Sequence, residues 1–396
     1  MKRKDIFIYS CIMIAFSFFA LEVVARALTG NSVIPDTSSW FKSAPRRTVD
    51  ANFKCSDKPM IKDLDKATDP QLRKLSEYQQ VCNSLVTSHM MVFSDMPKDD
   101  AEAVKKAKTM ATTLKEFSKY KVTPIVIVEP VASWGDIDFG EFKTGFYNKW
   151  LETYFKALKS EGITDQQMGI WVPFPEANLP YWNRNNAKAE DFGDMVNIYL
   201  TIAKTSFPKL YASVMLNSAT YSADDFDWAR GEYISLIPYV KNIKKGLVQS
   251  FGLQGFPWVP PANQTGPGIF DASEFLNYKL AQEAADAMGV KEIWFNTGTF
   301  GLKYAGDATR AREVDPERRT DVLNGILSQA QTLKEKGYKV SIHLFAEDKG
   351  STTEATDWSY FNKDNVLTSP ASPVFANFAS RLNQNDIDLW LFDRMH

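Results

Sequence analysis

The sequence contains few of the residues that build metal, redox or nucleotide sites. Its three histidines, His89, His343 and His396, are widely scattered, and no cysteine or histidine spacing is typical of zinc. No glycine-rich turn follows an apolar run, which argues against dinucleotide binding. The 46 basic and 48 acidic residues give a net charge of -2 without long runs of one sign, which does not suggest nucleic acid. We therefore predict no metal, no cofactor and no nucleic-acid partner.

The first 30 residues predict export. Lys2, Arg3 and Lys4 precede a mostly apolar run from Ile6 to Val24. Positive charge before such a run keeps the start in the cytosol and sends the rest across the membrane. The run is longer than most signal cores and favours an uncleaved membrane anchor, whereas the small residues of 25–27 leave a cleaved signal peptide open. The remainder is expected to be extracytoplasmic, anchored or secreted.

Only two cysteines lie beyond this run. Cys11 is inside it, so Cys55 and Cys82 are the thiols of the exported part. In an oxidising compartment two such thiols are expected to form a disulfide. Two reduced thiols are the alternative.

The rest of the chain alternates between strand and helix patterns. Residues 31–80 are polar and predict a linker and an irregular leading segment, and residues 81–396 predict one domain. Short apolar runs typical of buried parallel strands are Leu85–Phe93, Val122–Val128, Met168–Phe174, Leu210–Leu216, Leu247–Leu253, Glu292–Phe295 and Val340–Phe345. Helical patterns lie between them at Ala101–Tyr120, Glu141–Glu161, Asp191–Phe207, Tyr233–Lys245, Ser273–Met288 and Asp315–Lys336.

This alternation predicts the α/β class with a parallel sheet. An eighth strand before Leu85 would close a (β/α)8 barrel, and an open doubly wound sheet is the competing fold.

One carboxylate stands out at the end of a predicted strand. The segment Trp171–Leu179 places Glu176 directly after an apolar strand, and Tyr181 and Trp182 follow. Parallel barrels keep their chemistry at the carboxyl ends of strands, and aromatic rings offer a surface for a sugar. Glu176 is therefore predicted to be a general acid in a saccharide cleft. A loop glutamate that caps the next helix is the plain alternative.

The segment Gln167–Trp182 resembles the acid/base region of the family 26 β-mannanases and their cellulase-like relatives, which are retaining (β/α)8 glycoside hydrolases. In that clan the acid/base glutamate ends strand four and the nucleophilic glutamate ends strand seven. If the missing strand is the first, Glu176 takes the acid/base place. Pro175 departs from the histidine or asparagine that the relatives have there, and Asn296 stands where the nucleophile is expected.

An amide cannot form the covalent intermediate of a retaining hydrolase. The alternatives are a carboxylate after the last predicted strand (Glu347, Asp348, Glu354 or Asp357), an amide supplied by the substrate, or a barrel that binds sugar without cleaving it.

Aromatic and amide residues cluster after the predicted strands. Half of the ten tryptophans occupy these loops: Trp134, Trp182, Trp228, Trp258 and Trp358. Neutral hydrogen-bonding groups lie near the same strand ends, namely Asn178, Asn217, Gln249, Gln254 and Asn296. The sequence predicts a glycoside hydrolase-like protein that acts on a polysaccharide or glycan, with a non-catalytic carbohydrate-binding barrel of the cell envelope as the alternative.

Overall fold

The computed structural model describes residues 55, 59–82, 89–129, 131–132, 135–136, 139–179, 188–218, 235–257, 271–299, 316–346, 366–367, 369 and 371–392. These residues belong to the second of two units, 1–50 and 51–396. No helix in this described part is long and apolar enough to cross a membrane. The predicted N-terminal anchor lies outside the described residues.

Eight parallel strands form a closed barrel, which confirms the (β/α)8 prediction. Around the ring the order is β1, β10, β9, β8, β7, β6, β5, β2. The strands are β1 (His89–Asp95), β2 (Thr123–Glu129), β5 (Ile170–Pro173), β6 (Tyr211–Asn217), β7 (Ser250–Gln254), β8 (Glu292–Thr297), β9 (Lys339–Phe345) and β10 (Asp388–Phe392). A separate antiparallel pair joins β3 (Val131–Ala132) to β4 (Gly135–Asp136).

The source of the eighth strand differs from the prediction. The strand that completes the ring is β10, from the end of the chain, and not a segment before Leu85. It pairs with β1 on one side and β9 on the other. Counted along the chain, Glu176 therefore follows the third strand instead of the fourth, and Asn296 lies on the sixth instead of the seventh. Strand β10 has only five residues and follows a long stretch without a clear pattern, so its sequence showed too little periodicity to indicate a strand.

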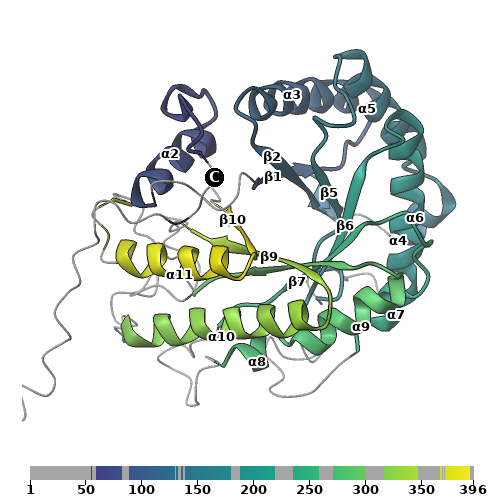
Figure 1. The fold of residues 1–396 in the computed structure, drawn as a ribbon. Coiled ribbons are helices and arrows are strands. Elements are labelled where there is room, and N and C mark those ends of the chain that lie inside the picture. Colours follow the sequence, from purple (N-terminus) through teal and green to yellow (C-terminus); the bar gives the residue numbers. More distant parts are fainter. Residues whose placement is uncertain are drawn as a thin grey trace, which may run out of the picture. The chain divides into compact units, whose positions relative to one another are not determined.

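Helices surround the strands, as Figure 1 shows. They are α2 (Pro70–Val81), α3 (Asp100–Lys119), α4 (Phe139–Thr144), α5 (Asn148–Ser160), α6 (Ala189–Ser206), α7 (Ile237–Val240), α8 (Ala272–Phe275), α9 (Tyr278–Met288), α10 (Pro316–Glu335) and α11 (Ser372–Gln384), with a short 3-10 helix η2 (Leu64–Lys66). Two predicted helices are each split in two, into α4 with α5 and α8 with α9. Helix α11 was not predicted.

Local sequence signals set several helix ends. The Asp99 side chain accepts a hydrogen bond from the backbone N–H of Glu102 at the start of α3. Helix α9 ends at Gly289, which has a φ of 74°. Glycine adopts this left-handed conformation without a Cβ clash, so it ends a helix at little cost.

The barrel has two separate apolar regions. The outer one lies between strands and helices, and the inner one fills the barrel with Met91, Ile125, Ile127, Ile170, Val172, Met215, Phe256, Trp294, Phe345 and Trp390. Because side chains alternate along a strand, the residues two positions away from these also lie on the inner face. This alternation determines which polar residues line the two mouths of the barrel.

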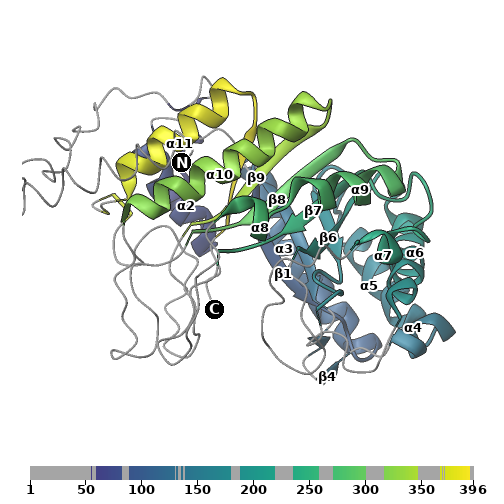
Figure 2. The same cartoon turned by 90° about the horizontal axis from the view of Figure 1, so that it is seen from below.

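The segment before β1 is more regular than predicted. It contains η2 and α2, and Tyr78 of α2 packs near Phe375 of α11 with ring centroids 6.5 Å apart. Figures 1 and 2 both show these two helices as neighbours. The disulfide between Cys55 and Cys82 is present, with both cysteines buried, so that prediction is confirmed.

Candidate active site

Glu176 lies in a constrained turn at the carboxyl end of β5. Its φ is 56°, and that of Phe174 is 55°. A non-glycine residue in this region costs on the order of 1–3 kcal/mol and persists only where its surroundings hold it. The Glu176 backbone N–H donates to the Met215 carbonyl at 3.0 Å, and its carbonyl accepts from Leu179 at 2.8 Å. The turn thus fixes the direction of a half-buried carboxylate.

A row of polar residues crosses the inner face of four neighbouring strands near the same end. Asn217 pairs in register with Gln254, Gln254 with Asn296, and Asn296 with His343. All four are at most 8% exposed. Three of them had been assigned to a sugar site from the sequence, and the structure brings these three together. We call these four residues the polar row.

Hydrogen bonds join the polar row to Glu176. The Glu176 Oε1 accepts from Asn217 Nδ2 at 2.8 Å and also from Gln254 Nε2. Gln254 Oε1 accepts from Asn296 Nδ2 at 2.6 Å, and Asn296 Oδ1 lies 2.8 Å from His343 Nδ1. The two amide donors thus bind the same oxygen of the Glu176 carboxyl group and hold its orientation. With this amide orientation, His343 donates from Nδ1, which fixes its tautomer.

Asn178 connects the turn that contains Glu176 to the backbone of the neighbouring strand β6. Its Nδ2 donates to the Asn217 carbonyl at 2.7 Å, and its Oδ1 accepts from the Asn217 backbone N–H at 2.9 Å. This double hydrogen bond ties the turn that contains Glu176 to the end of β6. Both polar groups of its amide bind the backbone, so Asn178 holds the turn in place. That it also binds substrate stays a prediction.

Burial keeps His343 neutral. The side chain is fully buried, and desolvation lowers its pKa from 6.5 to about 3. In an unfolded chain the imidazole takes up a proton near its ordinary pKa of about 6.5. Above that pH neither state is protonated, so His343 adds no pH dependence there. Between the two values only the unfolded state binds the proton, and the free energy of unfolding falls as the pH is lowered.

We expect the His343→Gln variant to show a weaker dependence of stability on acid than the wild type. Glutamine can still donate to Asn296 but does not titrate. As the pH falls from roughly 6 to 4, the free energy of unfolding of the wild type should decrease by about 1 kcal/mol more per pH unit than that of the variant. Chemical denaturation across this range, normalised at pH 7, measures the difference. If the free energies of unfolding of wild type and variant change in parallel with pH, His343 is protonated in the folded protein.

Two residues of this mouth were missed by the sequence analysis. His343 was judged only as a metal ligand, and its place in the polar row depends on strand register. Glu129 ends β2, and the alternation that puts Ile125 and Ile127 inside the barrel places it on the inner face too. The signal for Glu129 was available, because it also follows a buried strand and precedes a proline.

Several predicted site residues fall outside the part of the chain that the structure describes. Those that lie outside the described residues are Glu347, Asp348, Tyr181, Trp182, Trp134, Trp258 and Trp358. Glu354, Asp357 and Trp228 are outside them as well. Gln249 is described, and its side chain bonds to the backbone of Ala212 and Gly246 at the start of the strands, away from the polar row. Within the described ranges no group of three or more His, Cys, Asp or Glu could hold a metal ion.

Solved structures with a similar fold include two β-glucosidases and a mannosidase. The apo structure of a β-glucosidase, 1317, aligns with 11% identity and a TM-score of 0.50 over 78% of this chain and 87% of the other. The family 1 β-glucosidase from Thermotoga maritima aligns with 11% identity and a TM-score of 0.49, covering 79% and 86%. An exo-β-1,4-mannosidase from Opitutaceae bacterium strain TAV5 aligns with 12% identity and a TM-score of 0.49, covering 80% and 56%.

No protein-family model and no curated protein matches the chain. Identity of 11–12% supports a common fold and no more. The fold is therefore a (β/α)8 barrel similar to that of the β-glucosidase 1317, and the chemistry has to be argued from the residues of the site.

Proposed function

We propose that this protein cleaves glycosidic bonds of a polysaccharide or glycan outside the cytoplasm, with Glu176 as the essential catalytic carboxylate. The observation that carries the proposal is the strained turn that presents Glu176 at the carboxyl end of the barrel, where two side-chain amides bind one of its oxygens. Backbone strain around a carboxylate at such a place is typical of functional sites. A loop glutamate that only capped a helix would need neither feature.

The hydrogen bonds bear on the role of Glu176. Both side-chain amides bind Oε1 and so set the orientation of the carboxyl group, which a general acid/base needs in order to reach the glycosidic oxygen. We infer that Glu176 is the general acid/base of the reaction.

The ordinary mechanism of hydrolysis uses a second carboxylate together with Glu176, and we consider its place from the ring order of the strands. Glu176 and Asn296 are separated by three steps around the ring, from β5 through β6 and β7 to β8. Three steps also separate strands four and seven, which carry the two glutamates in the retaining (β/α)8 glycoside hydrolases that the Glu176 segment resembles. We infer by this criterion that Asn296 takes the place of the second glutamate and that the partner of Glu176 comes from another strand end.

The candidates for the second carboxylate are residues that follow β9 in the sequence and Glu129 at the end of β2. Counted along the chain, the seventh strand is β9, which ends at Phe345, two residues before Glu347. We propose Glu347 as the partner, with Asp348 and Glu129 as the alternatives. Assays of Glu347→Gln, Asp348→Asn and Glu129→Gln on one substrate separate them, because only the loss of the true partner should reduce turnover as strongly as the loss of Glu176.

The proposal is tested by release of reducing sugar from β-mannan, β-glucan and other glycans, together with aryl β-glycosides. Turnover by the wild-type protein supports hydrolysis. The second candidate function, a carbohydrate-binding barrel without catalysis, is favoured specifically by Asn296, which lies in the polar row with an amide at the nucleophile's ring position. Binding of an oligosaccharide without turnover would establish that alternative. We further propose that the protein is exported and either anchored by residues 1–30 or secreted.

We expect Trp182→Ala and Trp258→Ala each to weaken oligosaccharide binding by about 1–3 kcal/mol, because an indole supplies a flat apolar surface to a sugar ring. Tyr181, Trp134 and Trp358 are proposed as further contacts. Isothermal titration with an oligosaccharide measures the loss, and thermal melting is the control. Early unfolding of both variants with normal binding by the folded fraction would show that these tryptophans serve stability instead.

A further inference from the structure

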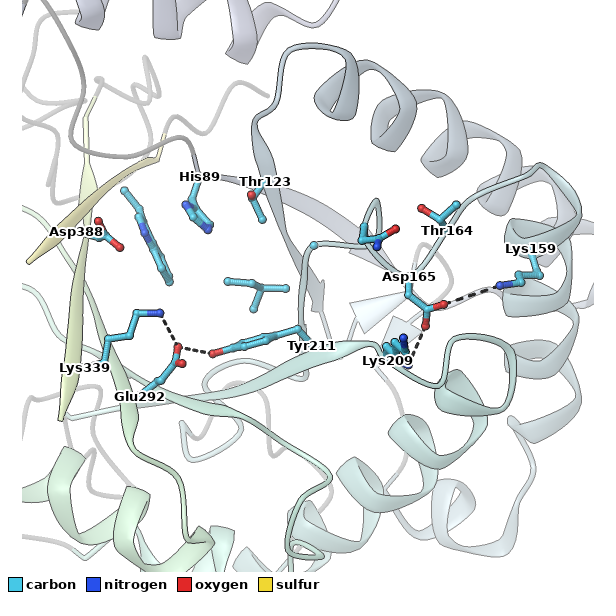
Figure 3. A pocket seen from close by; sticks show the side chains of 14 residues that line it. His89, Thr123, Lys159, Thr164, Asp165, Lys209, Tyr211, Glu292, Lys339 and Asp388 are labelled. Carbon is cyan, nitrogen blue, oxygen red and sulfur yellow. Dashed lines mark hydrogen bonds and ion pairs between the residues drawn. The ribbon is translucent and has the colours of Figure 1, made fainter. Parts of the chain in front are cut away.

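A cavity of about 600 Å³ opens at the other end of the barrel. The first residues of β1, β2, β5, β6, β8, β9 and β10 line it, so it is the amino-terminal mouth of the barrel. Figure 3 shows His89, Thr123, Tyr211 and Asp388 around this space. Barrel interiors are normally filled by side chains, and this mouth usually serves stability. A cavity of this volume is instead within the range of small-molecule sites, about 300–1,000 Å³.

An apolar layer separates this cavity from the polar row. Glu292, Trp294 and Asn296 are alternate residues on the inner face of β8, with Glu292 at the cavity and Asn296 in the row. Trp294 lies between them, 1% exposed, and its Nε1 donates to Ser213 Oγ at 2.8 Å. A Cβ on Gly252 would come within 2.6 Å of the indole, so the ring occupies the space beside that glycine. The two mouths are therefore distinct sites.

The cavity wall combines aromatic rings with hydrogen-bonding groups. The rings of Trp390 and His89 stack with centroids 4.6 Å apart, and the Tyr211 ring lines the space as well. The Tyr211 hydroxyl donates to Glu292 Oε2 at 2.7 Å, and Lys339 Nζ lies 3.3 Å from the same oxygen, as drawn in Figure 3. Burial raises the pKa of Tyr211 well above 10, so its hydroxyl stays protonated. Such a wall suits a ligand with an apolar face and several hydroxyl groups.

The charges around the cavity cancel. Three lysines (Lys159, Lys209, Lys339) and three carboxylates (Asp165, Glu292, Asp388) line it. Lys339 pairs with Glu292 at 3.3 Å, and Lys159 lies 4.0 Å from Asp165. An anion or a cation of substantial charge would have to displace one of these pairs and would gain no net attraction from the rest. A neutral ligand meets no such obstacle.

We propose that the amino-terminal mouth of the barrel binds a neutral, hydroxyl-rich small molecule, of the class of mono- and disaccharides. The site is independent of Glu176 and of the proposed hydrolysis. The carboxylates of Glu292 and Asp388 accept hydrogen bonds from ligand hydroxyls, the Thr123 hydroxyl adds a group that both donates and accepts, and the ring of Tyr211 covers an apolar face of the ligand.

The test uses the full chain labelled with ¹³C at isoleucine methyl groups. Ile170 lines the cavity, whereas Ile127 is buried in the barrel and does not line it, so the two report on binding and on background. D-glucose, D-mannose and cellobiose are added separately to about 10 mM, ten times a dissociation constant of about 1 mM. We expect saturable shifts of the Ile170 methyl signals with at least one of these sugars and no shift at Ile127.

Two variants and a matched control locate the effect. Thr123→Trp should fill the cavity and abolish the Ile170 shift, and Glu292→Gln should weaken binding about tenfold by removing a charged acceptor. Glu176→Gln, the same substitution at the opposite mouth, should leave binding unchanged. Melting temperatures check that Thr123→Trp folds. If it does not fold, the loss of affinity in Glu292→Gln tests whether the sugar binds in this cavity.

Three outcomes would overturn the proposal. One is an Ile170 signal that does not move with any of the three sugars. Another is a shift that appears with inorganic phosphate or citrate instead of sugar, because the site would then prefer an anion to a neutral ligand. The third is a sugar-dependent shift that Glu176→Gln abolishes, because the ligand would then be at the carboxyl-terminal mouth. None of these outcomes depends on whether the protein hydrolyses glycans.

Discussion

Glu176→Gln is expected to reduce hydrolysis of an unactivated glycan at least about 100-fold while leaving the fold intact. A positioned carboxylate that transfers a proton or attacks the sugar contributes about 10²–10⁴ to the rate. Glutamine keeps an oxygen that can accept from Asn217 and Gln254, so the hydrogen bonds at the end of the barrel need not be lost. Initial rates of reducing-sugar release, with melting temperatures for both proteins, measure the effect.

The matched control is Asn178→Ala, which removes a neighbour of Glu176 whose amide binds the Asn217 backbone. It should lower the melting temperature, since the two hydrogen bonds to Asn217 disappear, and should reduce activity less than Glu176→Gln does. Equal rates for wild type and Glu176→Gln would rule out every hydrolytic route proposed above. They would leave the binding function open.

Asn296→Glu distinguishes a lapsed hydrolase from an active one. In a lapsed hydrolase the new carboxylate restores the missing group and turnover appears. In an active enzyme that already has its second carboxylate the variant gains nothing, because a third carboxylate crowds the site with like charges.

Removal of the disulfide is expected to lower the free energy of unfolding by about 2–5 kcal/mol. Cys55 and Cys82 close a loop with a sequence separation of 27, and both lie in the buried core. Loss of the cross-link increases the conformational entropy of the unfolded chain. This entropy gain is one of the reasons why removal of a disulfide lowers stability. Denaturant titration of the Cys55→Ser, Cys82→Ser and double variants gives the change.

The two single variants and the double variant should be destabilised to nearly the same extent, because each removes the same bond. Cys11→Ser serves as the control, since it removes a cysteine that is not in the bond. Mass spectrometry of the unreduced wild type should detect the linked peptides. Unchanged unfolding midpoints in the double variant would show that the bond does not contribute to stability.

The sequence by itself determined the repeated strand and helix elements, the pairing of two cysteines and the placement of a carboxylate at a strand end. These features depend on local information. Short apolar runs such as Val122–Val128 mark buried strands wherever they later pair, and Cys55 and Cys82 are the only cysteines after Cys11. Glu176 follows its strand directly, so the end of the barrel at which it lies was fixed before any tertiary contact was known.

Only the tertiary structure decided how the ring closes and what surrounds Glu176. Strand β10 takes the ring position that had been given to a strand before Leu85, between β1 and β9, and pairing between the two ends of a chain leaves no local pattern. The polar row likewise depends on register, which brings Asn217, Gln254, Asn296 and His343 side by side from strands far apart in sequence. The cavity at the opposite mouth has the same origin, because it exists only where the first residues of seven strands meet.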